Sequence, residues 1–355
     1  MLYTNLGFRD NIKALYDFLI ENEYNQKYEI IVSTNDYTKY SDVAIDNVSF
    51  VSNIKGIPCY FKAGYVFYCF GKLPILPGKN QEVIQLWHGS PFKMADKGML
   101  EGHSWKRQYY THVVSTAKNF NDFWSYAFSI PKEKILIDGH CRCDLLFLPS
   151  PNYDFGSYKK LILWAPTFRK SSITGYSDVA QEETNVVPVV KNEELKGLNE
   201  YLKSAGVKIV VKLHPMQDID PTMMKDMDHL ILMSNKVFMS KGMDLYRLMK
   251  QSDALITDYS SIFYDYLLLD RPIGFTEDDM DDYGNTRGYA VDNVDAYRPG
   301  ERIKTIEDLK KFISDLSMEK DEYKSDRARV LKLSNDYVDG GYSKRLMDIL
   351  NIKND

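Results

Sequence analysis

The sequence predicts an α/β protein with two doubly wound domains, each built around a parallel sheet. Short apolar runs rich in Val and Ile alternate with segments whose apolar residues recur at helical spacing, which is typical of such sheets. This alternation starts again after the stretch Pro149-Ser150-Pro151. The chain has 355 residues, which suits two domains at roughly 150 residues each. We therefore expect one domain at 1–150 and a second at 151–355.

The first domain is expected to open with a helix over 11–22, where Ile12, Leu15 and Leu19 share one face. A doubly wound domain ordinarily opens with a strand, so we expect the first strand to be missing from this chain. A second helix is expected at 118–127. Apolar, β-branched runs predict strands at 28–33, 65–69, 82–87, 111–115 and 135–138.

The second domain repeats the pattern and ends in a helical tail over 306–350. The segment 169–188, rich in Ser, Thr and Asp, is expected to be a long exposed loop. Helices are predicted at 192–204, 244–251 and 262–269, and strands at 160–165, 207–213, 229–233, 254–257 and 272–275.

Composition narrows the class of protein. Hydrophobic residues make up 44% of the chain and charged residues 27%, which excludes intrinsic disorder and fibrous repeats. A net charge of -5 argues against non-specific electrostatic binding of nucleic acid by the protein as a whole. Local basic patches remain compatible with this charge. There is no signal-peptide pattern and no apolar run of about 18 residues, the length that a membrane-spanning helix needs.

The four cysteines predict reduced thiols in the cytoplasm, because they are too sparse for a disulfide framework. The His140-Cys141-x-Cys143 segment raises the question of a metal, but two cysteines one residue apart do not easily share one ion. We therefore expect no metal. The chain also lacks the sequence signatures of P-loop kinases, dinucleotide oxidoreductases, zincins and nucleophile-elbow hydrolases. Among enzyme classes, this leaves a transferase whose active site lies in a cleft between two domains.

Two histidines directly follow predicted strands, at the edge where an open α/β sheet binds ligands. His88 precedes a Gly-Ser-Pro turn, and Lys93 lies close enough to hold an anion. His214 is kept extended by Pro215. A histidine at such a place suits general base work near neutral pH. The alternative is that each histidine only caps its strand. Because two histidines occupy equivalent places in the two domains, this alternative is weaker.

Hydroxyl and basic residues follow other predicted strands. Thr257, Asp258, Ser260 and Ser261 stand between a strand and a helix, where hydroxyls and free N–H groups suit a phosphate; simple helix capping is the alternative. Further candidates for substrate or anion contacts, each more often a surface residue when taken alone, are Arg142, Asp144, Thr167, Arg169 and Arg287. The basic run 324–332 predicts a solvated helix face, with an anionic membrane surface as the alternative.

In these motifs the chain resembles the CDP-glycerol glycerophosphotransferases, the family of teichoic acid primases and polymerases. The resemblance runs from about Phe8 to the end of the chain, with Ser90, Phe92 and Cys141 as mild departures where the family usually has Thr, Leu and Pro. It rests on WHGSPFK at 87–93, GHCRCD at 139–144, APTFR at 165–169, KLHP at 212–215, TDYSS at 257–261 with Asp265, Arg287-Gly288, and DGGYSKR at 339–345.

The resemblance implies a GT-B-like fold, with two Rossmann-like domains facing a central cleft and C-terminal helices crossing back to the first. The first domain would serve the acceptor and the second the CDP-polyol donor, with CDP-glycerol favoured and CMP released. His88 would be the base. The groups on the donor phosphates would be His214, Ser260, Ser261, Thr257 and Arg287.

The resemblance also implies that no metal and no cofactor is needed. The acceptor would be a polyprenyl-linked glycan or a polyol-phosphate polymer, so the protein would act peripherally on the cytoplasmic face of the bacterial membrane. Basic residues would then cluster at the cleft mouth and on the C-terminal helices. Two alternatives stay open at this stage: a GT-B glycosyltransferase that uses a nucleotide-sugar, and a catalytically silent GT-B-like binding protein.

Overall fold

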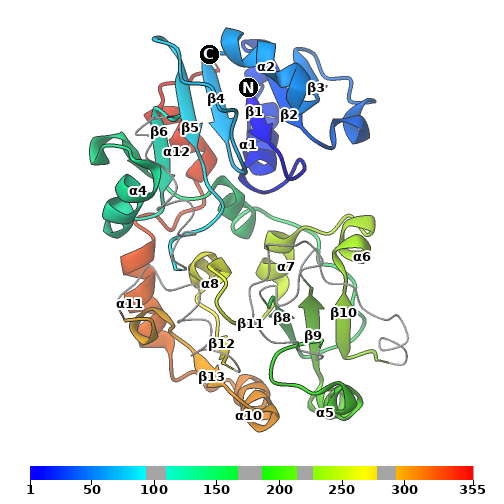
Figure 1. The fold of residues 1–355 in the computed structure, drawn as a ribbon. Helices are drawn as coiled ribbons and strands as arrows, with labels where there is room; N and C mark the ends of the chain where they lie inside the picture. Colours follow the sequence, from blue (N-terminus) through cyan, green and yellow to red (C-terminus); the bar gives the residue numbers. More distant parts are fainter. Residues whose placement is uncertain (93–108, 167–185, 214–226, 278–292, 355) are drawn as a thin grey trace. The chain divides into compact units, whose positions relative to one another are not determined.

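The computed structural model describes residues 1–92, 109–166, 186–213, 227–277 and 293–354 (Figure 1). They divide into two compact units. Unit 1 comprises Met1–Ser90, Ala95–Leu148 and Leu333–Asp355, and unit 2 comprises Pro91–Met94 and Pro149–Lys332. The chain thus passes between units at Leu148 and Pro149, next to the Pro-rich stretch, and its last segment belongs to unit 1.

Unit 1 contains a seven-stranded, fully parallel sheet in the order β3-β2-β1-β4-β5-β6-β7. The expectation of a missing first strand was wrong, because β1 (Leu2–Thr4) lies in the middle of the sheet and pairs with both β2 and β4. Its run Leu-Tyr-Thr is short and contains no Val or Ile, so this strand escaped detection. The other strands are β2 (Ile30–Thr34), β3 (Val48–Val51), β4 (Tyr65–Tyr68), β5 (Glu82–Gln85), β6 (His112–Ser115) and β7 (Ile135–Ile137).

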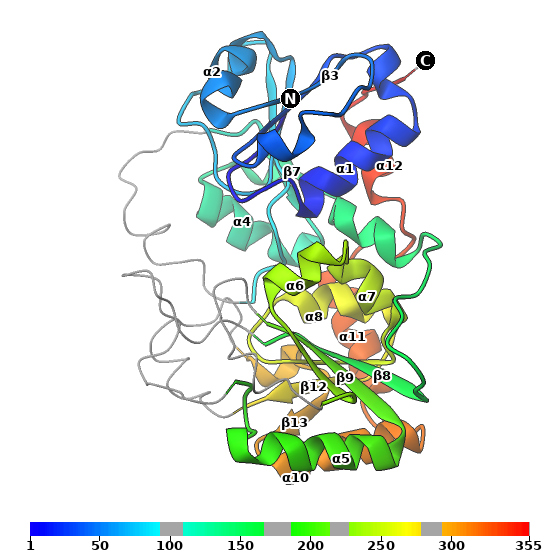
Figure 2. The same cartoon turned by 90° about the vertical axis from the view of Figure 1, so that its right-hand side faces the viewer.

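Helices cover both faces of this sheet. In Figure 2, α1 (Asp10–Glu21) and α12 (Tyr342–Ile349) lie on one side, and α2 (Asn53–Lys62) and α4 (Asn121–Phe128) on the other. Neither β3 nor α2 was predicted. The β3 residues are only half-buried, and α2 contains Pro58 and apolar residues on its outer side. Short 3-10 segments are η1 (Tyr24–Gln26), η2 (Tyr37–Tyr40), η3 (Lys118–Phe120), η4 (Lys132–Lys134) and η5 (Cys141–Leu146).

The C-terminal helix α12 packs into the core of unit 1, as the resemblance implied, through Leu346 and Met347. The Asp144 carboxylate fixes its first turn by accepting hydrogen bonds from the N–H groups of Tyr342 at 2.8 Å and Ser343 at 2.9 Å. Two free N–H groups at the helix start are satisfied in this way.

Gly139 lies where η5 and α12 meet, and we expect its replacement by alanine to destabilise unit 1. Its φ is 152°, and an added Cβ would overlap the Tyr342 ring. Overpacking of this kind costs about 1–3 kcal/mol of unfolding free energy. Gly197, inside a unit 2 helix, has open space at its Cβ position, so Gly197→Ala should instead stabilise by about 0.5–1 kcal/mol. Urea unfolding measures both, and equal effects would contradict the assignment.

Unit 2 contains a six-stranded parallel sheet in the order β10-β9-β8-β11-β12-β13. The unexpected strand is β13, which has three residues at the sheet edge. The strands are β8 (Lys160–Trp164), β9 (Val207–Lys212), β10 (Leu230–Met233), β11 (Ala254–Thr257), β12 (Ile273–Thr276) and β13 (Glu301–Ile303). Both sheets therefore confirm the predicted α/β class with parallel strands.

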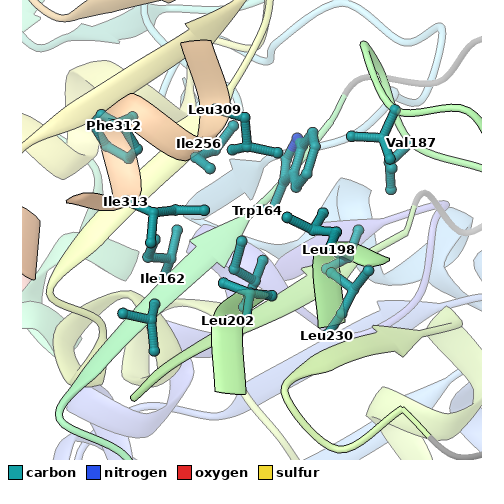
Figure 3. Packing of buried hydrophobic residues seen from close by; sticks show 14 of the residues in the cluster. Ile162, Trp164, Val187, Leu198, Leu202, Leu230, Ile256, Leu309, Phe312 and Ile313 are labelled. Atoms are coloured by element: carbon teal, nitrogen blue, oxygen red, sulfur yellow. The ribbon is translucent and has the colours of Figure 1, made fainter. Parts of the chain in front are cut away.

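One face of the unit 2 sheet is covered by α5 (Leu195–Ala205) and α10 (Ile306–Ser317), and the other by α7 (Leu245–Gln251) and α8 (Ile262–Tyr266) (Figure 2). Figure 3 shows the first interface, where Trp164 of β8 is fully buried among aliphatic side chains of α5, α10 and neighbouring strands. The remaining segments are η6 (Asn192–Glu194), α6 (Asn235–Ser240), which was not predicted, η8 (Leu267–Leu269), η9 (Asp295–Tyr297) and α11 (Lys324–Ser334). Most of the expected loop at 169–188 lies outside the described residues.

The basic run on α11 is not the uniformly solvated face that the sequence predicted. Arg327 is 1% exposed and pairs with Asp321 at 2.6 Å and Asp270 at 3.1 Å. Arg329 donates to the Ala296 carbonyl at 2.7 Å. These residues attach α11 to unit 2, which leaves fewer basic side chains for a membrane surface than the sequence suggested.

Candidate active site

His88 lies at the carboxyl edge of the unit 1 sheet, three residues after β5 ends at Gln85. The residue before it, Trp87, has a φ of 57°, in the left-handed region that bulky side chains avoid. Such a conformation costs about 1–3 kcal/mol and persists only where surrounding contacts hold it. The turn that presents His88 is therefore strained.

Two donors hold that strained turn through the Trp87 carbonyl oxygen. The Asn11 amide donates to it at 2.8 Å, and the Cys69 thiol donates at 3.1 Å. Asn11 is fully buried near the start of α1, and its own side-chain oxygen accepts the Arg142 N–H at 3.1 Å. Burial raises the pKa of Cys69 well above its usual value, so the thiol keeps the proton that it donates.

An ion pair completes this support. The Arg142 guanidinium donates to both carboxylate oxygens of Asp10, at 2.8 and 2.9 Å, and the Arg142 side chain is 7% exposed. Asp10 also accepts the Asn11 N–H at 2.8 Å. We call Asp10, Asn11, Cys69 and Arg142 the support cluster. It ties α1, the end of β4 and η5 to the turn before His88.

The His88 ring packs between aromatic neighbours, with its centroid 4.9 Å from that of Phe70 and 4.2 Å from that of Trp87. Its side chain nevertheless remains exposed to solvent. Desolvation by the surrounding protein lowers the pKa of His88 to about 4; Asp10 opposes this shift, and Arg142 adds to it. The imidazole is therefore neutral at pH 7 and accessible, which is the state that a general base needs.

The segment after His88 explains two of the departures from the family pattern. The Ser90 hydroxyl is buried and shares a hydrogen bond of 2.9 Å with the Thr116 hydroxyl, a contact that threonine could also make. Phe92 is 1% exposed, belongs to unit 2 and packs on Phe263 of α8 with ring centroids 5.0 Å apart. Phe92 thus fills a core position, which would also accommodate the leucine that the family usually has there.

In unit 2 the predicted phosphate motif follows β11 and leads into α8. Ser260 and Ser261 are partly exposed at the start of the helix, and the Ser260 hydroxyl accepts the Ile262 N–H at 3.4 Å. Thr257 is fully buried and donates its hydroxyl to the Ala165 carbonyl at 2.8 Å. Asp258 is also buried, and its carboxylate accepts the Tyr259 N–H at 2.6 Å. The two serines are therefore the side chains of this motif that are open to a ligand.

A cationic cluster near the end of β12 was missed by sequence reasoning. Glu277 pairs with Arg298 at 2.7 Å and with Arg302 at 3.1 Å, and the Lys304 ammonium lies 3.6 Å away. Arg298 is almost fully buried, and desolvation lowers its pKa while Tyr259 of the phosphate motif interacts with it. Arg298 and Arg302 also pair with Asp295, at 3.9 and 3.4 Å, so the cluster joins three cations and two carboxylates. Nothing in the spacing of these residues signals the cluster, because Glu277 and Arg298 are distant in sequence.

The remaining predicted residues fall into two groups. Arg142 and Asp144 are engaged inside unit 1, in the support cluster and at the start of α12, and their role in substrate binding stays a prediction. Five others lie outside the described residues: Lys93, Thr167, Arg169, His214 and Arg287.

In the described part of the chain no three His, Cys, Asp or Glu side chains gather as metal ligands. Cys141 and Cys143 are both buried and are not joined in a disulfide. None of the helices in that part is both long and apolar enough to cross a bilayer.

Comparison with known proteins agrees with this architecture. The wall teichoic acid polymerase TagF superposes on 99% of this chain and 88% of its own, with a TM-score of 0.72 and 21% identity. A putative UDP-N-acetylglucosamine 2-epimerase from Listeria monocytogenes has a TM-score of 0.57 at 12% identity and 99% coverage of this chain, against 95% of its own. These likenesses show a shared fold of the GT-B type.

Among curated relatives, a teichoic acid poly(ribitol-phosphate) polymerase of Bacillus spizizenii is 25% identical over 97% of this chain. The chain spans about half of that relative, 54% of its length. A teichoic acid poly(glycerol phosphate) polymerase of the same species is 27% identical over 86% of this chain and 79% of its own length.

A family model matches nearly the whole chain, from residue 2 to residue 351. The match includes both sheets, the turn at His88 and the serines before α8. This chain therefore belongs to the CDP-glycerol:poly(glycerophosphate) glycerophosphotransferase family.

Proposed function

We propose that the chain transfers a polyol phosphate from a CDP-polyol to a hydroxyl of a teichoic acid or capsule-type acceptor and releases CMP. The observation that carries this proposal is the neutral, exposed imidazole of His88 on a strained turn within a chain of this family. A phosphotransferase of this kind needs a base for the attacking hydroxyl and a site for the donor phosphates.

In the proposed step His88 takes the proton of the acceptor hydroxyl as its oxygen attacks the phosphorus that carries the polyol. A new P–O bond forms, and the bond from that phosphorus to the CMP oxygen breaks. CMP leaves with the bonding electrons as a phosphate. Because negative charge builds up on CMP, hydrogen-bond donors placed there lower the barrier.

Unit 2 would bind the donor. The side chains of Ser260 and Ser261 are partly exposed at the start of α8, and Arg298 interacts with Tyr259 of the same motif. His214, Thr257 and Arg287 remain proposed donor-phosphate residues from their motif positions. Unit 1, with His88, would serve the acceptor. No metal and no cofactor is proposed.

We propose glycerol phosphate as the favoured group because the family description names a glycerophosphotransferase. Ribitol phosphate is the rival, since curated relatives include polymerases of both kinds. The acceptor would be a polyprenyl-linked glycan or a growing polyol-phosphate chain, and the protein would work peripherally at the cytoplasmic membrane face. The names of the relatives, which are teichoic acid polymerases and primases, support a teichoic acid acceptor, and the membrane location rests on the family resemblance.

The test is a thermal-shift and calorimetric titration with CDP-glycerol, CDP-ribitol and a set of UDP-sugars. A ligand at about 100 times its Kd stabilises the folded state by roughly 2.7 kcal/mol, so a specific donor gives a clear rise in Tm. We expect a rise with one CDP-polyol, followed by CMP release when acceptor is added. A rise with UDP-sugars alone would assign the chain to sugar transfer, and no rise with any donor would favour a silent binding protein.

Ser260→Ala together with Ser261→Ala is expected to weaken CDP-polyol binding by at least about tenfold, because a hydrogen bond to a charged group contributes about 1.5–3 kcal/mol. Ser204→Ala is the matched control. That serine is exposed at the end of α5, where its hydroxyl donates to the Tyr201 carbonyl. Calorimetry measures both, and equal donor affinity in the two variants would remove the serines from the proposed site.

A further inference from the structure

Unit 1 contains a cavity of about 310 Å³ that has no part in the proposed reaction. Its walls come from α1, β2, β4, α12 and the C-terminal tail, all of which belong to unit 1. The wall residues are mostly apolar or aromatic and include Leu19, Tyr24, Ile30, Phe67, Met347 and Ile352.

The cavity opens at the end of the sheet opposite His88. Ile30 and Tyr65, which line it, are the first residues of β2 and β4, whereas His88 follows the last residue of β5. All of these strands are parallel, so the two places lie at opposite edges of one sheet. A ligand bound in this cavity would therefore lie apart from His88.

The volume sets the size of that ligand. An engineered apolar cavity of about 150 Å³ holds one benzene molecule, so a cavity of 310 Å³ has room for about a dozen carbon atoms. Apart from Lys62 and Glu29, the side chains that line the cavity carry no charge. The Met1 amino group in the wall donates to the Tyr65 carbonyl at 2.8 Å, and desolvation lowers its pKa to about 5, so it is neutral at pH 7.

Charged groups stand at the rim. Lys62 and Glu29 line the cavity and are exposed. Lys27 lies beside it, with its ammonium 5.8 Å from the ring of Tyr28, another lining residue. Two cations and one carboxylate therefore face the solvent there. This arrangement suits an aliphatic chain whose anionic head group stays outside the cavity.

The helix that supplies Lys62 also carries an apolar outer face. On α2, Ile54 is 80% exposed, Ile57 40% and Phe61 68%. The spacing i, i+3, i+7 puts them on one side of the helix, and Lys55 and Lys62 flank them. Both figures place α2 and the two chain ends at the same end of unit 1 (Figures 1 and 2). A lysine-flanked apolar face of this kind suits the interface of an anionic membrane.

We propose that unit 1 binds one acyl chain of an anionic membrane lipid in this cavity, while the outer face of α2 lies in the membrane interface. The cavity takes the chain, and Lys62 with Lys27 attracts the head group. This lipid is separate from the acceptor of the transfer reaction, because the cavity and His88 occupy opposite edges of the sheet.

The first test is calorimetric binding of alkyl phosphates with 6 to 14 carbons, each below its micellar concentration. Burying one methylene contributes about 0.8 kcal/mol, so affinity should rise about fourfold per added carbon until the cavity is full near twelve carbons, and then level off. A series that shows no dependence on chain length, or that still rises steeply at fourteen carbons, would overturn the proposal.

A filled cavity provides the second test. Gly64 lines the cavity, and a Cβ built there meets no atom within 4 Å, so Gly64→Trp should fold and obstruct the entrance. We expect its affinity for dodecyl phosphate to fall at least tenfold. Gly197→Trp, at an equally open site in unit 2, should bind as the unchanged protein does. Lys62→Glu should lower the affinity for dodecyl phosphate and raise the affinity for dodecyltrimethylammonium. Unchanged binding in Gly64→Trp or in Lys62→Glu would overturn the assignment.

Binding to lipid vesicles tests the membrane part of the proposal. The protein should co-sediment with phosphatidylglycerol vesicles and not with phosphatidylcholine vesicles, and Ile57→Glu with Phe61→Glu should abolish this. CDP-polyol affinity should be unchanged in these variants, so loss of lipid binding is distinguishable from failure of the proposed transfer function. Equal binding to both vesicle types, or vesicle binding that survives the double substitution, would overturn the membrane assignment.

Discussion

Replacing His88 with asparagine is expected to lower kcat for polyol-phosphate transfer by about 10²–10⁴-fold, the usual contribution of a general base. Asparagine keeps a polar side chain of similar size but cannot take a proton from the acceptor hydroxyl. Because the His88 side chain is exposed, the substitution should leave the unfolding free energy nearly unchanged. CMP release under saturating donor and acceptor measures the effect.

The control for this prediction is His112→Asn. His112 belongs to β6 of the same unit, and its ring pairs with Glu82 at 3.1 Å near the opposite edge of the sheet. That variant should retain full kcat. The donor Kd should be unaffected in both variants, because the proposed donor groups lie in unit 2. A His88→Asn enzyme with more than a tenth of the original kcat would exclude His88 as the base.

The lowered pKa of His88 sets the expected pH profile. A general base works only when it is unprotonated, so activity should be lost as the pH falls through its pKa. With that pKa at about 4, the acid limb of kcat/KM should lie well below the 6.5 of an ordinary histidine. A limb near pH 6.5 that disappears in His88→Asn would support the base role but contradict the desolvated ring environment.

Much of this architecture follows from local sequence patterns, and the failures have identifiable causes. Strands of four to six residues buried on both faces, such as β8 and β9, appear in the sequence as continuous apolar runs. Among the three-residue strands, β7 (Ile-Leu-Ile) is an apolar run and was predicted, whereas β1 and β13 carry no such run, although β1 lies inside its sheet. Backbone pairing with two neighbours defines β1, and that information resides in distant residues.

The site divides in a similar way. His88 and the two serines were selected as candidates because ligands bind beyond the carboxyl ends of the strands in open α/β folds, and these polar residues directly follow buried strands. The support cluster was only partly visible. Arg142 was selected as a substrate contact, yet its partner Asp10 lies at the start of α1, more than a hundred residues earlier, and the sequence gives no sign of the pairing. Long-range polar contacts of this kind require the fold itself.

Asp10→Asn is expected to have the largest effect on stability among substitutions away from the reacting groups. It removes the charge that pairs with the Arg142 guanidinium, whose side chain is 7% exposed, and breaking a buried ion pair costs about 3–5 kcal/mol. Because Asp10 itself is 20% exposed, we expect a value near the lower end of that range. Chemical unfolding monitored by tryptophan fluorescence measures it.

Asp17→Asn is the matched control, since Asp17 pairs with Lys13 on the same helix and both side chains are well exposed. Loss of such a surface pair costs about 0.3–0.5 kcal/mol. A second variant separates charge from packing: adding Arg142→Met to Asp10→Asn removes the buried cation as well and should recover much of the lost stability. If Asp10→Asn were as mild as Asp17→Asn, the ion pair would not hold the turn.

The same substitution also tests whether the support cluster acts on His88. Asp10 stabilises the protonated imidazole, so its neutralisation should lower the pKa of His88 further and move the acid limb of kcat/KM to lower pH. A purely structural role would reduce the amount of folded enzyme without moving that limb. A profile unchanged in position, measured on the folded fraction, would therefore restrict Asp10 to stability, whereas a downward shift would assign it to the positioning and tuning of the base.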